Sequence, residues 1–199
     1  MSEHREPTDH TLVAASLRGD HDAFAQLVRR HQRAMLNIAF RMLGDYDEAC
    51  EAVQDAFVAA WRNLQGFRQE AKFSTWLTSI TLNQARSRGE QLSRRRQLEG
   101  KSLDAPLRTR DGEVRLDPAS PAPSVHEQLE AEAVRQQVRD CIAALPADFR
   151  EVLVLRDMEE LSYDEVGATL NLQAGTVKSR LFRAREGVRE CLKRAMGSL

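Results

Sequence analysis

The chain lacks the features that mark membrane and secreted proteins. No apolar run approaches the ~18 residues of a membrane-spanning helix. The first residues, MSEHREPTDH, have no apolar core of the kind found in secretory signals. With 42% hydrophobic and 30% charged residues, a chain of 199 residues suits one or two small globular domains. We therefore expect a cytoplasmic protein with no direct membrane insertion.

Cysteine is scarce and gives no metal-binding pattern. Cys50, Cys141 and Cys191 lie far apart, without a C-x-x-C pair and without a histidine at ligand spacing. We interpret the three cysteines as small buried hydrophobic residues, and a redox role remains open. The five histidines form no H-E-x-x-H or comparable set. The sequence thus predicts no metal, no cofactor and no catalytic constellation, and the protein is not expected to be an enzyme.

Proline is also scarce, and four of the six prolines fall within residues 100–125. This stretch has few large apolar residues and no periodicity, which is typical of a flexible linker. Elsewhere helical signals dominate and no alternating strand pattern occurs. The sequence predicts an all-α protein, in which two small helical domains at 8–97 and 126–199 are joined by a flexible linker at 98–125.

Helix-start signals divide these domains further. In the first domain, helices are expected to begin after Thr8 or Asp9, at Asp20 or Asp22, at Asp45 with Glu48 completing a capping box, and at Ser74 or Thr75. In the second domain, helices are expected to resume near Val125 and to begin again at Pro146. The first domain is therefore predicted to have four helices.

Residues 161–192 carry the most information. Ser162 and Glu165 have the spacing of a capping box, and Asn171 suits a left-handed turn. Small Gly167 and Ala168 are expected to let a second helix cross closely. A second helix then has one apolar stripe, formed by Val177, Leu181, Val188 and Leu192. Two short helices joined by such a turn are typical of a helix-turn-helix.

The other side of the second helix is strongly basic. It carries seven cations against Glu186 and Glu190; the cations are Lys178, Arg180, Arg183, Arg185, Arg189, Lys193 and Arg194. The preceding residues 127–165 carry eleven acids against four bases. The net charge of −1 therefore conceals an acidic segment that is followed by a basic helix. A solvated surface helix is the alternative interpretation. The capped helix and the turn before it favour a helix that enters the DNA major groove.

Three segments in this order resemble group IV (extracytoplasmic-function) sigma factors of bacterial RNA polymerase. EACEAVQDAFVAAWRNLQGF resembles the family's region 2.2, FSTWLTSITLNQA its region 2.3, and LPADFREVLVLRDMEELSYDEVGATLNLQAGTVKSRLFRARE its region 4. The stretch GTVKSRLFRAR is close to a family signature. The resemblance implies that the first domain is sigma region 2 and the second is sigma region 4. It also implies a dissociable subunit that gives the polymerase promoter specificity.

The resemblance places DNA contacts in both domains. The expected contacts with the −35 element are Thr176, Lys178, Ser179, Phe182 and Arg183. Lys178 and Arg183 offer donors to guanine or phosphate, and Phe182 offers apolar contact to a thymine methyl. The expected contacts with the −10 element are Phe67, Arg68, Lys72, Asn83, Arg86 and Arg88. The loop 63–73 would capture a flipped base. For Phe67, packing in the core is an equal alternative.

The resemblance also implies protein partners. Gln54 and Asp55 would contact the clamp of the largest polymerase subunit, while Phe57 and Trp61 are expected to pack in the core. Phe149, Val152 and Leu153 would meet the flap of the second-largest subunit, with ordinary packing as an equal alternative. An anti-sigma factor is an expected regulator. The competing interpretation is a free-standing helix-turn-helix regulator that acts without core polymerase, which a long linker disfavours.

Overall fold

The computed structural model describes residues 7–68, 71–98 and 125–197, and within these ranges the regular elements are all helical. The first four helices are α1 (Asp9–Leu17), α2 (His21–Leu43), α3 (Tyr46–Asn63) and α4 (Phe73–Leu98), with a short 3₁₀ turn η1 (Leu64–Gly66) before α4. The others are α5 (Val125–Ala143), α6 (Ala147–Leu153), the π-helical turn η2 (Val154–Met158), α7 (Tyr163–Leu170) and α8 (Ala174–Met196). None of the described helices is long and apolar enough to cross a membrane. Most of the predicted linker lies outside the described residues.

Side-chain caps set most helix starts where the sequence predicts them. Thr8 accepts from the backbone N–H of Thr11, and Asp20 accepts from that of Ala23. Asp45 caps α3 by accepting from the N–H of Glu48, but the predicted capping box is incomplete because the Glu48 carboxylate binds Arg88 instead. Two predicted starts are slightly off: α4 begins at Phe73, one or two residues early, and Pro146 is the cap residue before α6.

Helices α1–α4 form the N-terminal group, which packs around its own core. α2, α3 and α4 contact one another, and α1 packs on α2. Leu27, Leu77 and Leu82 are almost completely buried at the centre. Burying each such side chain contributes about 1.5–3 kcal/mol, which is the main stabilisation available to a small all-α domain. Phe57 is buried in the core, as the sequence predicts, whereas Trp61 is half-buried and packs edge-on against Phe24 at 4.8 Å.

Helices α5–α8 form the C-terminal group, in which α8 contacts α5, α6 and α7. The core of this group includes Val152, Val154, Leu155, Val166 and Val177, which are all fully buried. α8 also passes close to the α5–α6 junction, because a Cβ added at Gly187 would lie 2.8 Å from Leu145 Cδ2.

A disulfide joins the two ends of the C-terminal group. Cys141 in α5 and Cys191 in α8 are bonded, with their Cα atoms 5.6 Å apart. Cys141 is buried, as the sequence predicts, but the interpretation of the cysteines as small hydrophobic residues is wrong for this bonded pair. Sequence spacing did not indicate the pairing because 50 residues separate the two cysteines, and only the antiparallel packing of α5 on α8 brings them together. Cys50 is free and half-buried.

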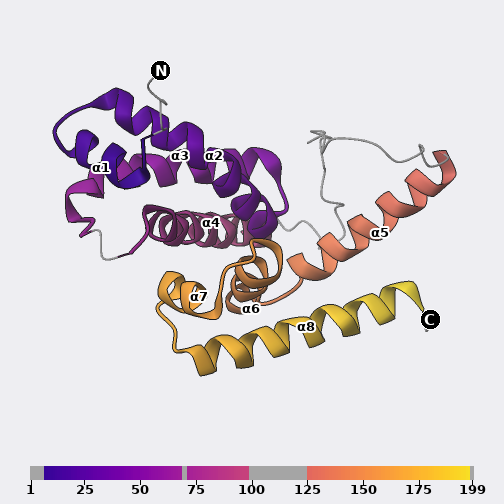
Figure 1. Ribbon diagram of the computed structural model, residues 1–199. Helices are drawn as coiled ribbons and strands as arrows, with labels where there is room; N and C mark the ends of the chain where they lie inside the picture. The colour runs from indigo at the N-terminus through magenta and orange to yellow at the C-terminus, as the bar shows by residue number, and fades with distance from the viewer. Residues whose placement is uncertain (1–6, 69–70, 99–124, 198–199) are drawn as a thin grey trace, which may run out of the picture.

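The two groups pack against each other. α6 and α7 lie between α4 above and α8 below (Figure 1). The contacts between the groups join α4 to α7, and α2 to α5, α6 and η2. The buried side chains of both groups form one continuous cluster. The chain is thus folded back on itself across the predicted linker.

Candidate nucleic-acid interface

The helix-turn-helix has the local geometry that its sequence predicts. The Ser162 hydroxyl accepts from the backbone N–H of Glu165, and the Glu165 carboxylate accepts from the N–H of Ser162, which completes the capping box of α7. Asn171 ends α7 in the left-handed conformation, with φ of 53°. The close approach at Gly167 is to the turn itself, since an added Cβ would lie 2.8 Å from the carbonyl oxygen of Leu172. α8 follows directly.

The first turns of α8 present four of the five predicted −35 contacts to solvent. Lys178, Ser179, Phe182 and Arg183 are exposed on one side of the helix, and Thr176 is half-buried. The opposite side packs through Val177, Leu181 and Ala184, which are buried. Phe182 is 67% exposed, which is unusual for a large aromatic side chain without a partner. This row is therefore free to enter a groove.

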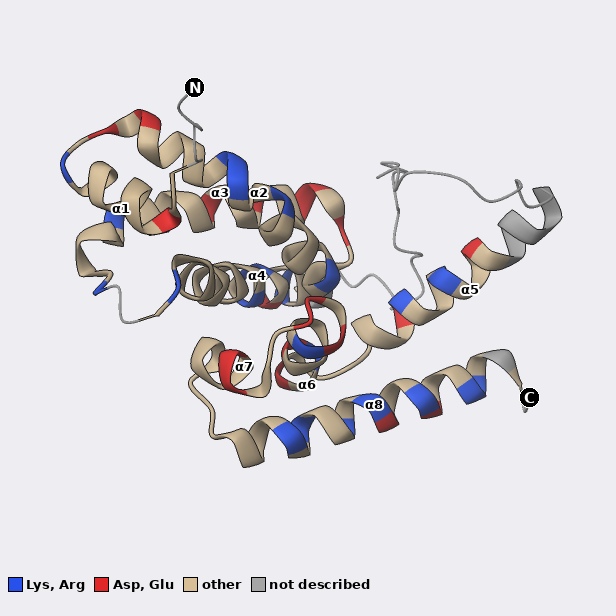
Figure 2. Ribbon diagram, in the orientation of Figure 1, with Lys and Arg blue, Asp and Glu red and all other residues tan. Residues whose placement is uncertain are grey.

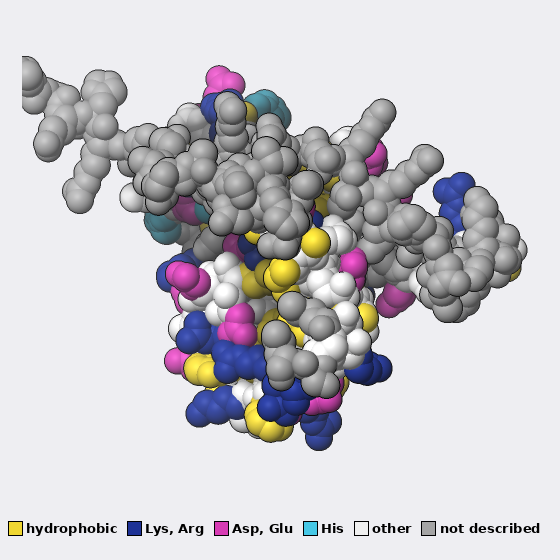
Figure 3. All heavy atoms as spheres, turned by 90° about the vertical axis from the view of Figure 1, so that its right-hand side faces the viewer, with side chains coloured by type: hydrophobic (Ala, Val, Ile, Leu, Met, Phe, Trp, Pro, Cys, Tyr) yellow, Lys and Arg dark blue, Asp and Glu magenta, His cyan; other side chains and the backbone are white. Residues whose placement is uncertain are grey.

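Other cations of α8 bind acids of the same group. Arg185 forms a two-pronged pair with Asp157, at 2.9 Å from Nε and 2.7 Å from Nη2. Arg180 lies 3.6 Å from Asp148. These pairs hold α8 on α6 and η2, and the helix carries Lys and Arg along its whole length (Figure 2). From the side, Lys and Arg side chains gather at the lower edge of the molecule, where α8 lies (Figure 3).

The predicted −10 residues fall into three sets: exposed, buried in the core, and bound to acids. Arg68 and Asn83 are exposed on the surface of the N-terminal group. Phe67 is buried and stacks on Trp76 with ring centroids 4.9 Å apart, and it meets Phe73 edge-on at 5.9 Å. Of the two roles open to Phe67, the structure therefore gives it the one in the core.

Three predicted −10 cations already bind acids. The Arg86 guanidinium binds both oxygens of Glu151, at 2.5 and 2.7 Å from Nη2. Lys72 Nζ lies 2.7 Å from Glu165 Oε1. Arg88 binds Glu48 on the neighbouring helix α3. Two of the three partners belong to the C-terminal group.

A cavity of about 300 Å³ opens beside the predicted base-capturing loop. The loop lines it with Phe67, Ala71 and Lys72, and α4 adds Phe73 and Ser74. The remaining wall comes from α1 and its cap, through Thr8, Asp9, His10 and Val13. The volume is at the lower end for small-ligand pockets. Sequence reasoning missed the contribution of α1, because nothing in residues 8–13 indicates a partner some sixty residues away.

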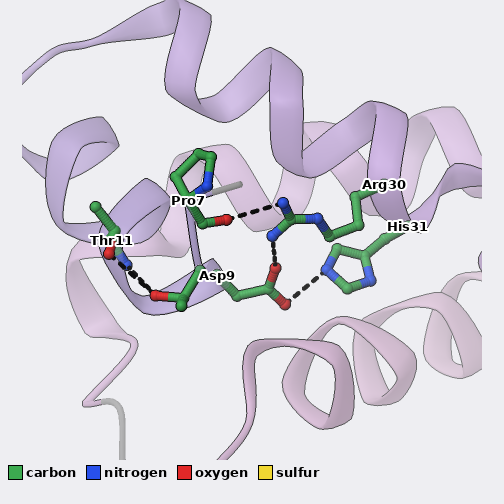
Figure 4. A network of polar contacts seen from close by, with 6 residues as sticks. Pro7, Asp9, Thr11, Arg30 and His31 are labelled. Carbon is green, nitrogen blue, oxygen red and sulfur yellow. Dashed lines mark hydrogen bonds and ion pairs between the residues drawn. The ribbon is translucent and has the colours of Figure 1, made fainter. Parts of the chain in front are cut away.

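A polar network fixes α1 at this cavity (Figure 4). The Asp9 carboxylate lies between two side chains of α2, accepting from Arg30 Nη1 at 2.6 Å and pairing with His31 Nε2 at 2.8 Å. Arg30 also donates to the carbonyl oxygen of Pro7 at 2.8 Å. His31 in turn lies 5.5 Å from the Phe73 ring. The cavity wall is thus tied to α2.

Asp9→Asn is expected to lower the free energy of unfolding by about 1 kcal/mol, because both partners are partly exposed and solvent screens the lost charge. Urea unfolding followed by circular dichroism measures the change. Asp22→Asn is the matched control, since Asp22 also lies in the first turn of its helix but is exposed. Equal losses in both variants would mean that the helix dipole, and not the network, accounts for the effect.

The predicted polymerase contacts differ in accessibility. Gln54 and Asp55 are exposed on α3, next to Val58, which is 41% exposed. Phe149 is half-buried, whereas Val152 and Leu153 are buried in the core of the C-terminal group. Fully packed side chains cannot touch a partner without rearrangement, so in this conformation Val152 and Leu153 have a structural role. Among the described residues, no His, Cys, Asp or Glu group is placed to hold a metal ion.

Comparison with known proteins gives the family. Residues 27–96 match the family Sigma-70 region 2, and residues 135–186 match the family Sigma-70, region 4. The RNA polymerase sigma-H factor of Pseudomonas aeruginosa is 34% identical over 192 residues, which cover 93% of this chain and 94% of that protein. The ECF RNA polymerase sigma factor SigW of Bacillus subtilis is 33% identical over 176 residues, which cover 88% and 92%.

A solved structure has the same fold. The sigma factor RpoE of Bartonella quintana, in complex with the anti-sigma factor NepR, superposes with a TM-score of 0.62 at 26% identity, covering 85% of this chain and 96% of that one. Both family matches, the near full-length relatives and the two helical groups agree. The chain therefore belongs to the sigma-70 family of RNA polymerase sigma factors, within the extracytoplasmic-function group.

Proposed function

We propose that the chain acts in the cytoplasm as a dissociable sigma subunit, without catalytic activity of its own. It would bind core RNA polymerase and direct initiation at promoters with a −35 and a −10 element. The proposal rests on the solvent-facing row of α8, which is the second helix of a complete helix-turn-helix. This row consists of Lys178, Ser179, Phe182 and Arg183. Phosphate contacts would position this helix and base-edge contacts would give specificity. The domain limits 8–97, 98–125 and 126–199 belong to the same proposal.

The N-terminal group would read the −10 element. Extracting a base from the stack costs a few kcal/mol, so a shaped receptor is needed to read it. The 300 Å³ cavity supports this role because loop residues and α1 line it, and the exposed Lys72 is one of these residues. Exposed Arg68 and Asn83, together with Arg86 and Arg88 once released from their acids, would hold the separating strands. These phosphate contacts make binding depend on salt.

The proposal includes protein partners. The exposed face of α3 with Gln54, Asp55 and Val58 would dock on the clamp of the largest subunit. Phe149 would meet the flap of the second-largest subunit. An anti-sigma factor would regulate the chain, as NepR binds the Bartonella quintana relative.

Transcription in vitro tests the function. Purified chain is added to core polymerase with a library of genomic fragments, and the transcripts are sequenced. Discrete start sites sharing two upstream elements are expected only when the chain is present. Binding to duplex DNA without any chain-dependent transcript would instead favour a free-standing helix-turn-helix regulator.

Arg183→Ala is expected to weaken recognition of the −35 element by about 1–3 kcal/mol, because the guanidinium can no longer donate hydrogen bonds to a base edge. Transcription from promoters with and without an altered −35 element measures this change. Arg189→Ala is the matched control, since Arg189 lies on the same helix two turns later and pairs with Glu186. An unchanged promoter preference in Arg183→Ala would remove this residue from the interface.

A further inference from the structure

The Cys141–Cys191 disulfide lies at the edge of the core of the C-terminal group. Among residues 131–143 of α5, only Cys141 and Ile142 are buried. Residues 185–195 of α8 are all half-buried or exposed. The last turns of α5 and α8 therefore pack through few buried side chains, and the bond joins them covalently where that packing is sparse.

The bond encloses the part of the chain that is proposed to read the −35 element. Residues 141–191 include all of α6 and α7 and most of α8, together with the exposed row from Lys178 to Arg183. A helical group as small as residues 125–197 is marginally stable unless a covalent link or another constraint supports it. A disulfide restricts the unfolded chain and so favours the folded state. Bond formation therefore raises the fraction of chains whose helix-turn-helix is folded.

A permanent disulfide is unusual in the compartment where the chain is proposed to act. Thiols in the cytoplasm are kept reduced, and the disulfides that form there are mostly transient, as in catalysis or redox sensing. A bond that only an oxidising compartment maintains does not suit a subunit of RNA polymerase. A pair of thiols that is reduced at rest and bonded under oxidation does.

Resting on the proposed function, we infer that Cys141 and Cys191 form a reversible thiol–disulfide site, at which a hydroperoxide converts the −35-reading helices from a marginally stable to a stable form. The dithiol is the resting state and the disulfide is the active state. Oxidation raises initiation from promoters that depend on the −35 element, because apparent promoter affinity scales with the fraction of the chain in the binding-competent state.

The two cysteines differ in access and therefore in their roles. Cys191 is half-buried, whereas Cys141 is 1% exposed. The Cys191 thiolate attacks the O–O bond of hydrogen peroxide, which breaks to give a sulfenic acid and hydroxide. The Cys141 thiolate then attacks the sulfenic sulfur, which forms the disulfide and releases a second hydroxide. The two thiols lose two electrons and two protons in total, and the peroxide is reduced to two molecules of water.

Alkylation and mass spectrometry of the full chain test the site. In glutathione buffers as reducing as the cytoplasm, all three cysteines are expected to react as free thiols. A small excess of hydrogen peroxide is expected to remove two thiols together and to leave Cys50 free, and dithiothreitol is expected to restore both. A bond that persists in the reducing buffers would be permanent, and thiols that survive peroxide would exclude a redox site. Either result overturns the inference.

Two alanine variants test the roles of the two thiols. Cys141→Ala is expected to stop at the sulfenic acid on Cys191, which dimedone traps as an adduct. Cys191→Ala retains only the buried thiol of the pair and is expected to give no adduct there. Cys50→Ser is the matched control, because it keeps the pair and should form the bond as the wild type does. An adduct at Cys141 and none at Cys191 would overturn the assigned roles.

Hydrogen exchange measures the change in stability without a variant that could fail to fold. In the wild type, amides of α7 and α8 are expected to exchange at least about 100-fold more slowly in the disulfide form than in the dithiol form. Amides of α3, which lies outside the loop, are expected to exchange equally in both forms. Equal exchange of α7 and α8 in the two forms would overturn the inference.

Transcription in vitro measures the change in activity. Peroxide is removed before core polymerase is added, and promoters with an intact and an altered −35 element are compared. The oxidised chain is expected to give at least about fivefold more transcript from the intact promoter than the reduced chain. Cys141→Ala should not respond to peroxide. Equal transcription from both forms of the wild type would overturn the disulfide as the active state.

Failure of the thiol site is distinguishable from failure of the proposed function. Alkylation and hydrogen exchange need neither polymerase nor DNA. If both change as expected while the chain directs no transcription, the sigma function fails and the thiol–disulfide site stands. If the chain directs transcription but its thiols do not pair, the site fails and the sigma function stands.

Discussion

Reduction of the Cys141–Cys191 disulfide is expected to lower the free energy of unfolding of helices α5–α8 by about 4 kcal/mol. The bond closes a loop across 50 residues, and this loop encloses α6, α7 and most of α8. In the chain-entropy account, restricting the unfolded chain over a loop of this length contributes about 4 kcal/mol. Urea unfolding with and without a thiol reductant, followed by circular dichroism at 222 nm, measures the loss.

Two cysteine variants complete this experiment. Cys191→Ser should behave like the reduced wild type in either condition. Cys50→Ser is the matched control, because Cys50 is free and lies on α3 outside the loop, so its reductant-dependent loss should equal that of the wild type. Mass spectrometry of the alkylated protein counts the free thiols. Unfolding midpoints that do not respond to reductant in a protein with one free thiol would contradict the expected stabilisation.

Gly167→Ala is expected to reduce −35-dependent transcription by more than tenfold. The new methyl group would lie 2.8 Å from the carbonyl oxygen of Leu172, which is backbone and cannot rotate away. The turn is also held by the hydrogen bond from the N–H of Leu172 to the carbonyl of Gly167, at 2.9 Å. Overpacking of this kind costs about 1–3 kcal/mol, and relieving it moves the start of α8. A recognition helix shifted at its first turn loses its base contacts.

Gly175→Ala is the control for Gly167→Ala. Gly175 lies in the first turn of α8, and a Cβ there meets nothing within 4 Å. Alanine at this helical position is expected to leave promoter choice unchanged and to stabilise α8 by about 0.5–1 kcal/mol. Transcription from one promoter with an intact and an altered −35 element separates loss of recognition from loss of core binding. Equal activity of the two variants would show that the turn tolerates the methyl group.

Local interactions explain why so much of the helical layout could be predicted. Thr8, Asp20, Asp45 and Ser162 each cap a helix through a hydrogen bond to a backbone N–H three residues away. Such bonds depend on neighbours in sequence, so they are visible without a fold. Glu48 shows where this reasoning fails. Its carboxylate binds Arg88, forty residues further along the chain, instead of the backbone N–H of Asp45.

The candidate site was predictable only in part, for the same reason. The exposed row on α8 follows from helical spacing, since Val177 and Leu181 define the buried side and Lys178 and Phe182 follow them. Phe67 shows the limit of this reasoning. An aromatic residue in a loop suits base stacking and core packing equally, and its stack on Trp76 depends on how η1 meets α4.

The sequence by itself determined the helices, their caps and turns, and which side of α8 is basic, because these depend on residues within four positions of one another. Tertiary structure decided which charges meet. Glu151 and Arg86 are 65 residues apart, and Cys141 and Cys191 are 50 apart. No periodicity specifies such pairs, since they arise only when one helix packs on another. That packing turned an acid-rich segment into the partner of the cations proposed to bind the promoter.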